Sequence, residues 1–369
     1  MVTKDIDEKY MSLALELAEK GRGRVEPNPM VGAVLVKDGA IVGKGYHQIF
    51  GGAHAEIHAI NEGGENGKGA SLYVSMEPCA HFGKTAPCAD AIIRAGITKV
   101  VAAVADPNPV TAGRGIRKLK DAGIEIQIGV LEHQARRLNA PFFKLMQKGI
   151  PYVIAKWAMS LDGKIATYTG ESKWITSEES RGYVHKIRGQ VDGILVGINT
   201  VLRDDPLLTC RTEGGRNPRR IIIDSNALLP LNSRLLNTIN ESEVVVAVNK
   251  NAQVERIEIL RQLGCRVIQT CNTMDRVDLK ELFYRLGEME LTNILVEGGS
   301  RVITSFFEER LVDKVMVFIA PIIIGGEGAR SPVLGKGIDT IREATEIREI
   351  TVQRISKDIL VEGVLELEP

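Results

Sequence analysis

The sequence predicts two consecutive α/β domains, because the chain is long and because helical and strand patterns alternate along it. At 369 residues it exceeds what one ordinary hydrophobic core supports. The alternation runs to about residue 145, breaks between residues 139 and 151, and then resumes. We therefore expect one domain over residues 1–147 and a second over residues 148–369, each a sheet covered by helices.

The first domain is expected to contain a sheet with helices layered on it. Leucine and alanine recur at helical spacing over residues 10–20, and a Lys37-Asp38-Gly39 turn joins two strand-like runs into a hairpin. Further helices are expected over residues 54–60 and 87–95. The expected strands cover residues 31–36, 40–46, 71–75, 100–104 and 124–128.

The second domain repeats the alternation, which favours a mostly parallel sheet. Helices are expected over 178–188 and 254–263, and strands over 152–156, 193–196, 220–223, 244–248, 266–268, 293–296, 314–319 and 359–364. Between the 293–296 strand and an apolar helix from Val302 lies Gly298-Gly299, where backbone N–H groups can face a phosphate. No G-x-G-x-x-G is present, so a tight connection without a ligand explains this turn equally well.

The composition indicates a soluble globular protein. Lys plus Arg and Asp plus Glu number 47 each, and no long basic tract occurs, which disfavours nucleic-acid binding through phosphate neutralisation. The charged N-terminus has no secretory apolar region, and no apolar run reaches the length of a membrane span. Five cysteines, an odd number, indicate reduced thiols. We expect a cytoplasmic protein with no nucleic-acid or membrane partner.

The most informative motif places His54 and Glu56 two residues apart, followed by Pro78-Cys79 and then Cys88. One imidazole and two thiolates suit Zn²⁺, and three protein ligands leave the fourth tetrahedral position for water. Cys88 is expected at a helix N-terminus, which favours the thiolate. The sequence therefore predicts one open zinc site per chain, with Glu56 as the catalytic carboxylate that shuttles protons.

A closed structural site is the competing interpretation. His58 follows His54 by four residues, so on a helix both could bind a metal together with the two cysteines, leaving Glu56 solvated. Structural sites more often use short paired spacings such as C-x₂₋₄-C, which favours the open site. A site without metal is less favoured still, because unrelated residues seldom give H-x-E and P-C together.

The open site resembles that of the zinc deaminases of bases and nucleosides, whose signature is H-x-E…P-C-x-x-C. The chain departs from this signature, since eight residues rather than two separate Cys79 from Cys88. That longer insert and several other motifs resemble the bifunctional RibD (RibG) family of riboflavin biosynthesis over essentially the whole chain. The motifs are PNPMVG from Pro27, AHAE from Ala53, EPCAHFGKTAPC from Glu77, DPNP from Asp106, SLDG from Ser160, SKWIT from Ser172, DDP from Asp204, LTCR from Leu208 and VEGGS from Val296. Ala86 departs from the second proline that the family usually has there.

The resemblance implies a cytidine-deaminase-like α/β/α layered first domain and a dihydrofolate-reductase-like α/β second domain. It also implies a diaminohydroxyphosphoribosylaminopyrimidine deaminase joined to a 5-amino-6-(5-phosphoribosylamino)uracil reductase. The residues that it assigns to the deaminase substrate are Asn28, His47, Ala55, Lys84, Asp106 and Asn108. Lys84 suits the phosphate as a point charge, and a solvated loop lysine is the alternative.

The same resemblance implies that the second domain uses NADPH to convert a ribosyl side chain to ribityl. The residues assigned to NADPH are Ala158, Trp174, Thr200, Asp204 and the 299–305 turn, which comprises Gly299, Ser300, Arg301, Val302, Ile303, Thr304 and Ser305. Those assigned to the substrate are Ser172, Arg188, Leu208, Arg211 and Glu297, with the two arginines suited to its phosphate. Lys156 and Asp204 are both candidates for the proton donor. Core packing of Trp174 and a surface role for Arg211 are the alternatives.

Two other classes of function stay open at this point. The zinc motif alone permits a nucleic-acid deaminase, but the balanced charge, the long insert and the second domain disfavour it. A zinc-stabilised module that only senses a nucleotide would lack a catalytic carboxylate, whereas Glu56 is present. Because folds of these kinds commonly pair, we expect a homo-oligomer. The resemblance implies that its substrate is a small phosphorylated pyrimidine.

Overall fold

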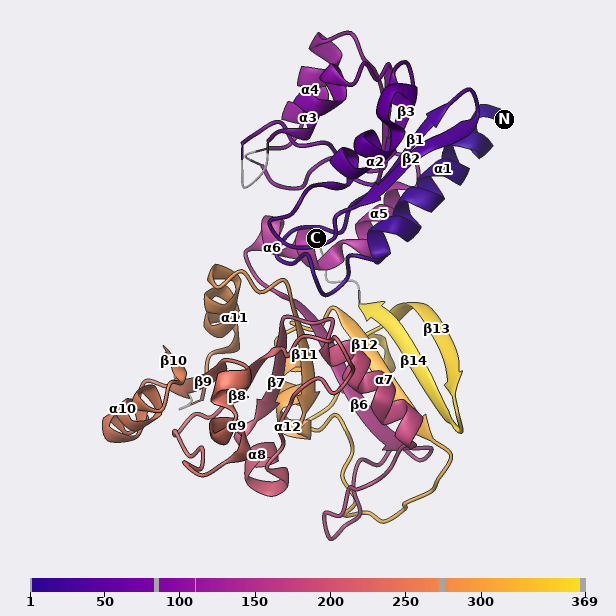
Figure 1. Cartoon of the computed structure of the whole chain (residues 1–369). Helices are drawn as coiled ribbons and strands as arrows, with labels where there is room; N and C mark the ends of the chain where they lie inside the picture. The colour runs from indigo at the N-terminus through magenta and orange to yellow at the C-terminus, as the bar shows by residue number, and fades with distance from the viewer. Residues whose placement is uncertain (1, 83–85, 110, 272–275, 366–369) are drawn as a thin grey trace. The chain divides into compact units, whose positions relative to one another are not determined.

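The chain folds into two compact units, Met1–Gly149 and Ile150–Pro369 (Figure 1). The structure is a computed structural model that describes residues 2–82, 86–109, 111–271 and 276–365. The expected boundary between residues 147 and 148 lies within helix α6 (Ala140–Lys148), two residues before the division between the units. No helix in these described ranges is both long enough and apolar enough to cross a bilayer.

The first unit contains a five-stranded sheet in the order β2-β1-β3-β4-β5. Strand β1 pairs antiparallel with β2 and β3, whereas β3, β4 and β5 are parallel. Their bounds are β1 (Gly32–Lys37), β2 (Ala40–Tyr46), β3 (Ser71–Val74), β4 (Lys99–Ala102) and β5 (Glu125–Ile128). Each expected strand of this domain is therefore present.

Helices cover both faces of this sheet and make three layers. Successive strand residues point to opposite faces, so Ala33 and Leu35 belong to one core and Val34 and Val36 to the other. The first core includes residues of α2 (Ala55–Gly63), α3 (Cys88–Arg94) and α4 (Arg114–Asp121). The second includes residues of α1 (Val2–Glu19), α5 (Glu132–Leu138) and α6. A short 3₁₀ helix, Gly64–Gly67, follows α2.

Helix α2 lies unusually close to strand β2, and this contact fixes the residues at its N-terminus. A Cβ atom on Gly45 would lie 2.2 Å from the carbonyl oxygen of Ala55, so only glycine allows this approach. Ala55 is the first residue of α2, directly between His54 and Glu56. The glycine therefore determines where the H-x-E motif lies relative to the sheet.

The second unit contains a nine-stranded sheet in the order β10-β9-β8-β7-β11-β6-β12-β14-β13. Neighbours from β10 to β12 are parallel, and β14 pairs antiparallel with β12 and β13. The bounds are β6 (Tyr152–Ser160), β7 (Gly193–Gly197), β8 (Arg219–Ile223), β9 (Val244–Asn249), β10 (Arg266–Thr270), β11 (Asn293–Gly298), β12 (Lys314–Ala320), β13 (Ile347–Ile355) and β14 (Asp358–Leu365).

Two large cores lie on opposite faces of the parallel part of this sheet. One contains Leu195 and Ile221 with residues of helices α11 and α12, and the other contains Ile194 and Ile222 with residues of α9 and α10. A smaller core packs Val184 of α7 against Phe318 of β12. The helices are α7 (Glu178–Arg188), α8 (Ile198–Asp204), α9 (Arg234–Asn237), α10 (Val254–Gln262), α11 (Leu279–Glu288) and α12 (Ser300–Glu308), with 3₁₀ turns at Ile239–Glu241 and Ile341–Glu343.

Several elements differ from the sequence-based expectation. Helix α1 begins at Val2 rather than at residue 10, and the break expected between residues 139 and 151 is mostly helix α6, with Pro141 in its first turn. Helices α4, α5, α8, α9 and α11 and strand β13 were not expected. Helix α4 buries only Gly115 and Leu119, and the seven central residues of β13 are exposed, so neither shows a clear apolar period.

Candidate functional site

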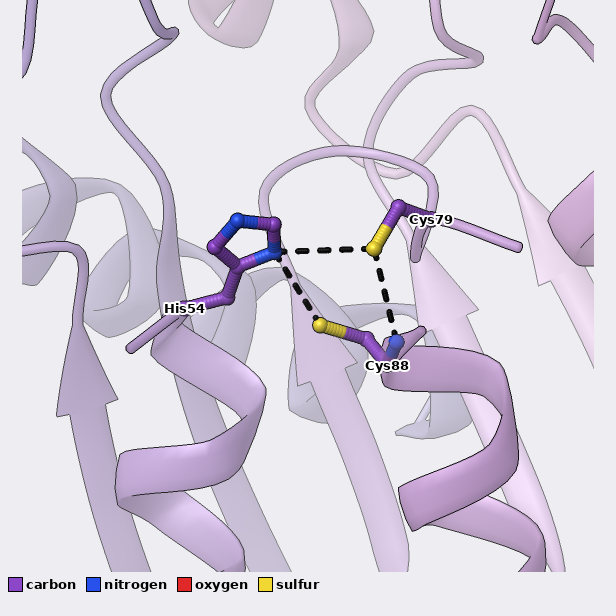
Figure 2. A group of neighbouring side chains, drawn as sticks. All are labelled: His54, Cys79 and Cys88. Carbon is purple, nitrogen blue, oxygen red and sulfur yellow. Dashed lines mark hydrogen bonds between the residues drawn. The ribbon is translucent and has the colours of Figure 1, made fainter. Parts of the chain in front are cut away.

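Three potential metal ligands from separate segments converge in the first unit (Figure 2). His54 precedes α2 as its N-cap, Cys79 lies in the segment after β3, and Cys88 is the first residue of α3. His54 Nδ1 lies 3.2 Å from Cys88 Sγ and 3.5 Å from Cys79 Sγ. The Cys88 backbone N–H also donates to Cys79 Sγ at 3.4 Å, so the start of α3 holds this sulfur in place.

The protonation of the two cysteines suits a cation between them. A hydrogen bond with the Cys88 thiol, helped by His54, outweighs burial and lowers the pKa of Cys79 to about 4. The same contact with Cys79, together with burial, raises the pKa of the Cys88 thiol. The contact thus favours a thiolate at Cys79 beside a thiol at Cys88, because two adjacent thiolates repel each other. A divalent cation would remove that repulsion and accept both as thiolates.

The ligand group has three members rather than four. Among the residues that the structure describes, His54, Cys79 and Cys88 place their ligand atoms within 4.8 Å of one another, and no other His, Cys, Asp or Glu joins them. His58 is therefore outside the group, which argues against the closed Cys₂His₂ alternative. One nitrogen and two sulfurs match the donor set of an open Zn²⁺ site.

Glu56 lies beside these ligands as a buried carboxylic acid. It occupies the first turn of α2, and only 3% of its surface is exposed. Burial, opposed by the nearby His54, raises the pKa of Glu56 to about 7. A carboxyl group with a pKa near neutrality can both accept and return a proton at physiological pH.

A second histidine continues the site on the other side of His54. The His47 and His54 rings meet edge to face with centroids 5.4 Å apart. His47 Nε2 lies 3.3 Å from Asn28 Nδ2, and His47 Nδ1 lies 3.1 Å from the carbonyl oxygen of Ala53. Burial lowers the pKa of His47, which favours the neutral ring. The structure thus brings Asn28, His47 and the H-x-E motif together.

The segment that carries Asp106 and Asn108 is ordered by its own side chains. Asp106 Oδ1 accepts from the Asn108 N–H at 2.9 Å, and Asp106 Oδ2 accepts from Thr111 Oγ1 at 2.6 Å. Ala55 is fully buried between His54 and Glu56. Lys84, which the resemblance assigns to the phosphate, lies outside the described residues.

The second unit has its own cluster of buried charges, centred on Glu297 at the end of β11. Arg188, the last residue of α7, donates from Nε and Nη2 to the two carboxylate oxygens of Glu297, both at 2.8 Å. Lys156 of β6 places Nζ 3.9 Å from the same carboxylate. Although burial acts to raise it, Arg188 and Lys156 lower the pKa of Glu297 to about 2. The carboxylate is therefore ionised at neutral pH.

The same cluster includes His185, which the sequence did not single out. His185 Nδ1 lies 3.1 Å from the carbonyl oxygen of Thr209, and Arg188 Nη1 donates to the same oxygen at 3.4 Å. Burial, together with the charges of Arg188 and Arg211, lowers the pKa of His185. The spacing of His185 and Arg188 on one helix offered a signal, but only the fold brings Thr209 beside them.

Comparison with known proteins identifies the family. The model described as the RibD C-terminal domain matches residues 151–361, and that of the cytidine and deoxycytidylate deaminase zinc-binding region matches residues 4–104. The riboflavin biosynthesis protein RibD of Aquifex aeolicus is 46% identical over 361 residues, which cover 97% of this chain and 98% of the relative. The Escherichia coli RibD is 39% identical over 96% of this chain and 98% of its own.

The chain belongs to the RibD family.

Solved RibD structures have the same fold along the whole chain. Acinetobacter baumannii RibD matches with a TM-score of 0.88 at 35% identity, covering 99% of this chain and 100% of the other. A Thermotoga maritima deaminase/reductase matches with a TM-score of 0.85 at 37% identity over the same shares. The expected fold class, a cytidine-deaminase-like domain followed by a dihydrofolate-reductase-like domain, is confirmed. As a RibD, the chain is a bifunctional riboflavin biosynthesis enzyme with a zinc-dependent deaminase domain and an NADPH-dependent reductase domain.

The residues that the RibD resemblance assigns to NADPH lie on four parts of the second unit: α8, β6, the segment before α7 and the start of α12. Thr200 and Asp204 belong to α8, and a Cβ atom on Gly299 would lie 3.6 Å from Thr200 Oγ1. Ala158 lies in β6. Trp174 is 69% exposed with the Arg181 guanidinium 4.4 Å from its ring centre, so core packing does not explain it. The glycine pair before α12 suits a phosphate at a helix N-terminus.

The 299–305 segment is a helix rather than a turn. Helix α12 begins at Ser300, two residues before the start expected from the sequence, and Gly299 is its N-cap. Ile303 belongs to the hydrophobic core, and Thr304 Oγ1 accepts from the Leu334 N–H at 2.7 Å. The side chains of Ile303 and Thr304 therefore have structural partners. The glycine pair and Ser300 form the N-terminal end of the helix.

Of the remaining assigned substrate residues, Leu208 and Arg211 flank Thr209, whose carbonyl oxygen contacts His185 and Arg188. Leu208 is buried with φ of 54°, a left-handed conformation that turns the chain sharply before Thr209. Arg211 follows two residues later. Ser172 is half-buried in the segment before α7. Asp204 carries a carboxylate oxygen 3.7 Å from Lys173 Nζ and does not belong to the Glu297 cluster.

Proposed function

We propose that the first domain deaminates 2,5-diamino-6-ribosylamino-4(3H)-pyrimidinone 5′-phosphate to 5-amino-6-(5-phosphoribosylamino)uracil. The second domain then reduces the ribosyl side chain of that product to ribityl. The observation that carries this proposal is the convergence of His54, Cys79 and Cys88 beside the buried acid Glu56. The Thermotoga maritima relative, a diaminohydroxyphosphoribosylaminopyrimidine deaminase and 5-amino-6-(5-phosphoribosylamino)uracil reductase, supports the choice of substrates.

His54, Cys79 and Cys88 are the proposed zinc ligands, and their donor atoms suit that ion. When bound there, zinc supplies Lewis-acid chemistry that makes a water acidic enough to give hydroxide near neutral pH. Glu56 accepts one proton of the attacking water and passes it to the ring nitrogen, and it then passes the second proton to the departing amine. A carbon–oxygen bond forms, the carbon–nitrogen bond breaks, and ammonia leaves. The burial of Glu56 beside the three proposed ligands supports this role.

The deaminase substrate is proposed to contact Asn28, His47, Ala55, Asp106 and Asn108, with Lys84 at its phosphate. The 3.3 Å contact between Asn28 and His47 favours this assignment, because each side chain orients the other. His47 is held a second time through Ala53, directly before His54. Because the Ala53 carbonyl oxygen can only accept, Nδ1 of the neutral His47 ring carries the proton and Nε2 is an acceptor that adds no charge to the site.

The reductase site is proposed to hold NADPH on Ala158, Trp174, Thr200, Asp204 and the start of α12 within residues 299–305. NADPH supplies a hydride when bound. Ser172, Arg188, Leu208, Arg211 and Glu297 are the proposed substrate residues. Because Arg188 is bidentate to Glu297, we assign the substrate phosphate to Arg211 and the orientation of Glu297 to Arg188.

Lys156 is the proposed proton donor, in preference to Asp204. Opening the ribosyl ring breaks a carbon–oxygen bond and leaves an oxygen that must gain a proton. The Lys156 ammonium lies in the Glu297 cluster, where burial lowers its pKa and makes proton release easier. Asp204 pairs with Lys173 and lies outside that cluster.

The cellular setting and assembly are also proposals. The absence of a spanning helix in the described part of the chain and the RibD relatives support a cytoplasmic enzyme. The exposed strand β13, which ends the sheet and presents Ile350 and Val352 at 58% and 67% exposure, supports a homo-oligomer. The partner proposed for the active site is a small phosphorylated pyrimidine and not a nucleic acid or a membrane.

Mass spectrometry of the pyrimidinone ribotide tests the proposal. With zinc-loaded protein alone we expect exchange of one amine for oxygen, and with NADPH added we expect two further hydrogens. Glu56→Gln should keep zinc and abolish the exchange, while the reductase still converts added deaminated product. Ammonia released from RNA oligonucleotides but not from the free ribotide would contradict the assignment.

A further inference from the structure

Glu77 stands two residues before the metal ligand Cys79, and the proposed mechanism gives it no role. Its side chain is buried, with 7% of the residue exposed. Its backbone N–H donates to the Val104 carbonyl at 2.9 Å, which continues the pairing of β3 with β4 beyond the ends of both strands. The carboxylate therefore starts from a fixed position just beyond the C-terminal ends of strands β3 and β4, in the segment that carries Cys79.

Four backbone N–H groups converge on this one carboxylate. Oε2 accepts from Asp106 at 3.1 Å and Gly113 at 3.0 Å, and Oε1 accepts from Gly115 at 3.0 Å and Ile116 at 3.2 Å. Gly113, Gly115 and Ile116 are the N-cap and early residues of α4, whose first N–H groups have no partner within the helix. A carboxylate is the one side chain able to accept four such bonds and to match the positive end of the helix dipole.

These four bonds enclose the segment that carries Asp106 and Asn108. One bond holds the backbone of Asp106 itself, and the other three hold the start of α4 on the far side of the segment. Within it, Asp106 accepts from Asn108 and Thr111, so the side chain of Asp106 is oriented once its backbone is fixed. Glu77 thus ties both ends of this segment to one point.

The same point is joined to the metal ligand by a stiff connection. Pro78, with its restricted backbone, lies directly between Glu77 and Cys79. A Cβ atom on Gly115 would lie 1.8 Å from the Pro78 carbonyl oxygen, so the start of α4 packs against the residue before the ligand. Two contacts therefore set the distance between Cys79 and the Asp106 segment: the hydrogen bonds of Glu77 and the packing of Gly115 against the Pro78 carbonyl.

We propose that Glu77 is a positioning residue of the deaminase, which holds the substrate-binding Asp106–Asn108 segment at a fixed place relative to the metal ligand Cys79. This inference rests on the proposed contact of Asp106 and Asn108 with the pyrimidine ribotide. Glu77 itself touches neither the substrate nor the metal. Its effect is on how well the substrate is held.

The test is Glu77→Gln in the full-length, zinc-loaded enzyme. The amide keeps the size of the side chain but turns an NH₂ group toward two backbone donors, so two of the four bonds are lost. We expect the deaminase KM for the pyrimidine ribotide to rise about ten- to a hundredfold. The zinc content and the reductase kcat/KM of the same chain should stay at the wild-type values. Glu125→Gln, an exposed carboxylate on β5, is the matched control and should change nothing.

Two results would overturn the inference. One is an unchanged KM in Glu77→Gln, and the other is a loss of zinc and kcat at unchanged KM, which is what a purely structural role gives. Asp106→Ala separates this inference from the proposed function: if Asp106→Ala leaves KM unchanged, the substrate assignment fails. If Asp106→Ala raises KM and Glu77→Gln does not, only the role of Glu77 fails.

Hydrogen exchange on the wild-type enzyme gives a second measurement that does not depend on a variant that folds. The amides of Asp106, Gly113, Gly115 and Ile116 should exchange slowly, at rates close to those of the neighbouring strand β4. Exchange as fast as that of exposed loop amides would show that the carboxylate does not hold them and would reject the proposal.

Discussion

Lys156 lies between a carboxylate and a guanidinium, and these neighbours decide at which pH the reductase half can supply a proton. Burial lowers the pKa of Lys156, Glu297 acts in the opposite direction, and Arg188 reinforces the decrease. If the Lys156 ammonium is the proton donor, as proposed, activity is present below this pKa and is lost as the pH rises through it. The alkaline loss should therefore begin below the pH at which an ordinary lysine titrates.

The reductase kcat of the wild-type enzyme should fall on the alkaline side, at a pH below about 10.4. Lys156→Met should lower kcat by about 10²–10⁴-fold, because it removes the general acid. Lys156→Arg keeps the positive charge but titrates far higher, so it should be slow and should lack the alkaline limb. The measurement is kcat against pH with the deaminated ribotide and NADPH.

Lys314→Arg is the control for this profile. Lys314 lies on β12 and pairs with Glu362 at 2.7 Å rather than with Glu297, so its substitution should leave the pH profile unchanged. If Lys156→Arg turned over normally with the wild-type alkaline limb, Lys156 would not be the donor.

At the scale of single elements, helix α4 bears on the deaminase half because its start packs against Pro78, the residue before Cys79. Its exposed, basic sequence buries only Gly115 and Leu119, so the sequence pattern did not predict a helix there. Its N-terminal groups are satisfied by Glu77 rather than by a local capping side chain. The residues at the start of α4 supply the N–H donors, but the acceptor, Glu77, is distant in sequence. The local sequence therefore does not show where this helix begins.

Gly115→Ala should destabilise the deaminase domain by about 1–3 kcal/mol or more, because the new methyl group would lie 1.8 Å from the Pro78 carbonyl oxygen and the backbone must move. We expect a lower melting temperature for that domain and weaker zinc retention, measured by calorimetry and metal analysis. Gly182→Ala is the matched control, since a Cβ atom in that helix meets open space. It should be neutral or stabilise by about 0.5–1 kcal/mol. If the melting temperature of the deaminase domain were the same in Gly115→Ala as in Gly182→Ala, the role of the Gly115 contact would be contradicted.

At the scale of the whole molecule, each unit has its own hydrophobic cores and its own site. The candidate metal ligands all belong to the first unit, whereas the Glu297 cluster and the residues assigned to NADPH belong to the second. A domain with a separate core can keep its structure when the other loses a ligand. The two activities should therefore respond independently to the loss of zinc.

Removal of zinc with a chelator should abolish deamination and leave the reductase kcat/KM within about twofold of its starting value. Metal binding stabilises the state that holds it, so only the melting transition of the first unit should shift downward. Both activities are followed on the same sample, and added zinc should restore the first. A parallel loss of reductase activity would show that the second unit depends on the zinc site.

The sequence by itself determined the chemistry of the ligands and the class of each domain. His54, Cys79 and Cys88 could be named as candidate ligands, and Glu56 as the carboxylate beside them, because metal binding requires particular side chains at particular spacings. The strands could be located because buried strands have a periodic apolar pattern. Only the tertiary structure decided that His58 stays outside the ligand group, that Glu56 is buried, and that Arg188 pairs with Glu297. Glu77 and the start of α4, 36 residues apart, likewise meet only in the fold. Burial, proton affinity and backbone hydrogen bonds depend on neighbours that are distant in sequence, so no local pattern contains them.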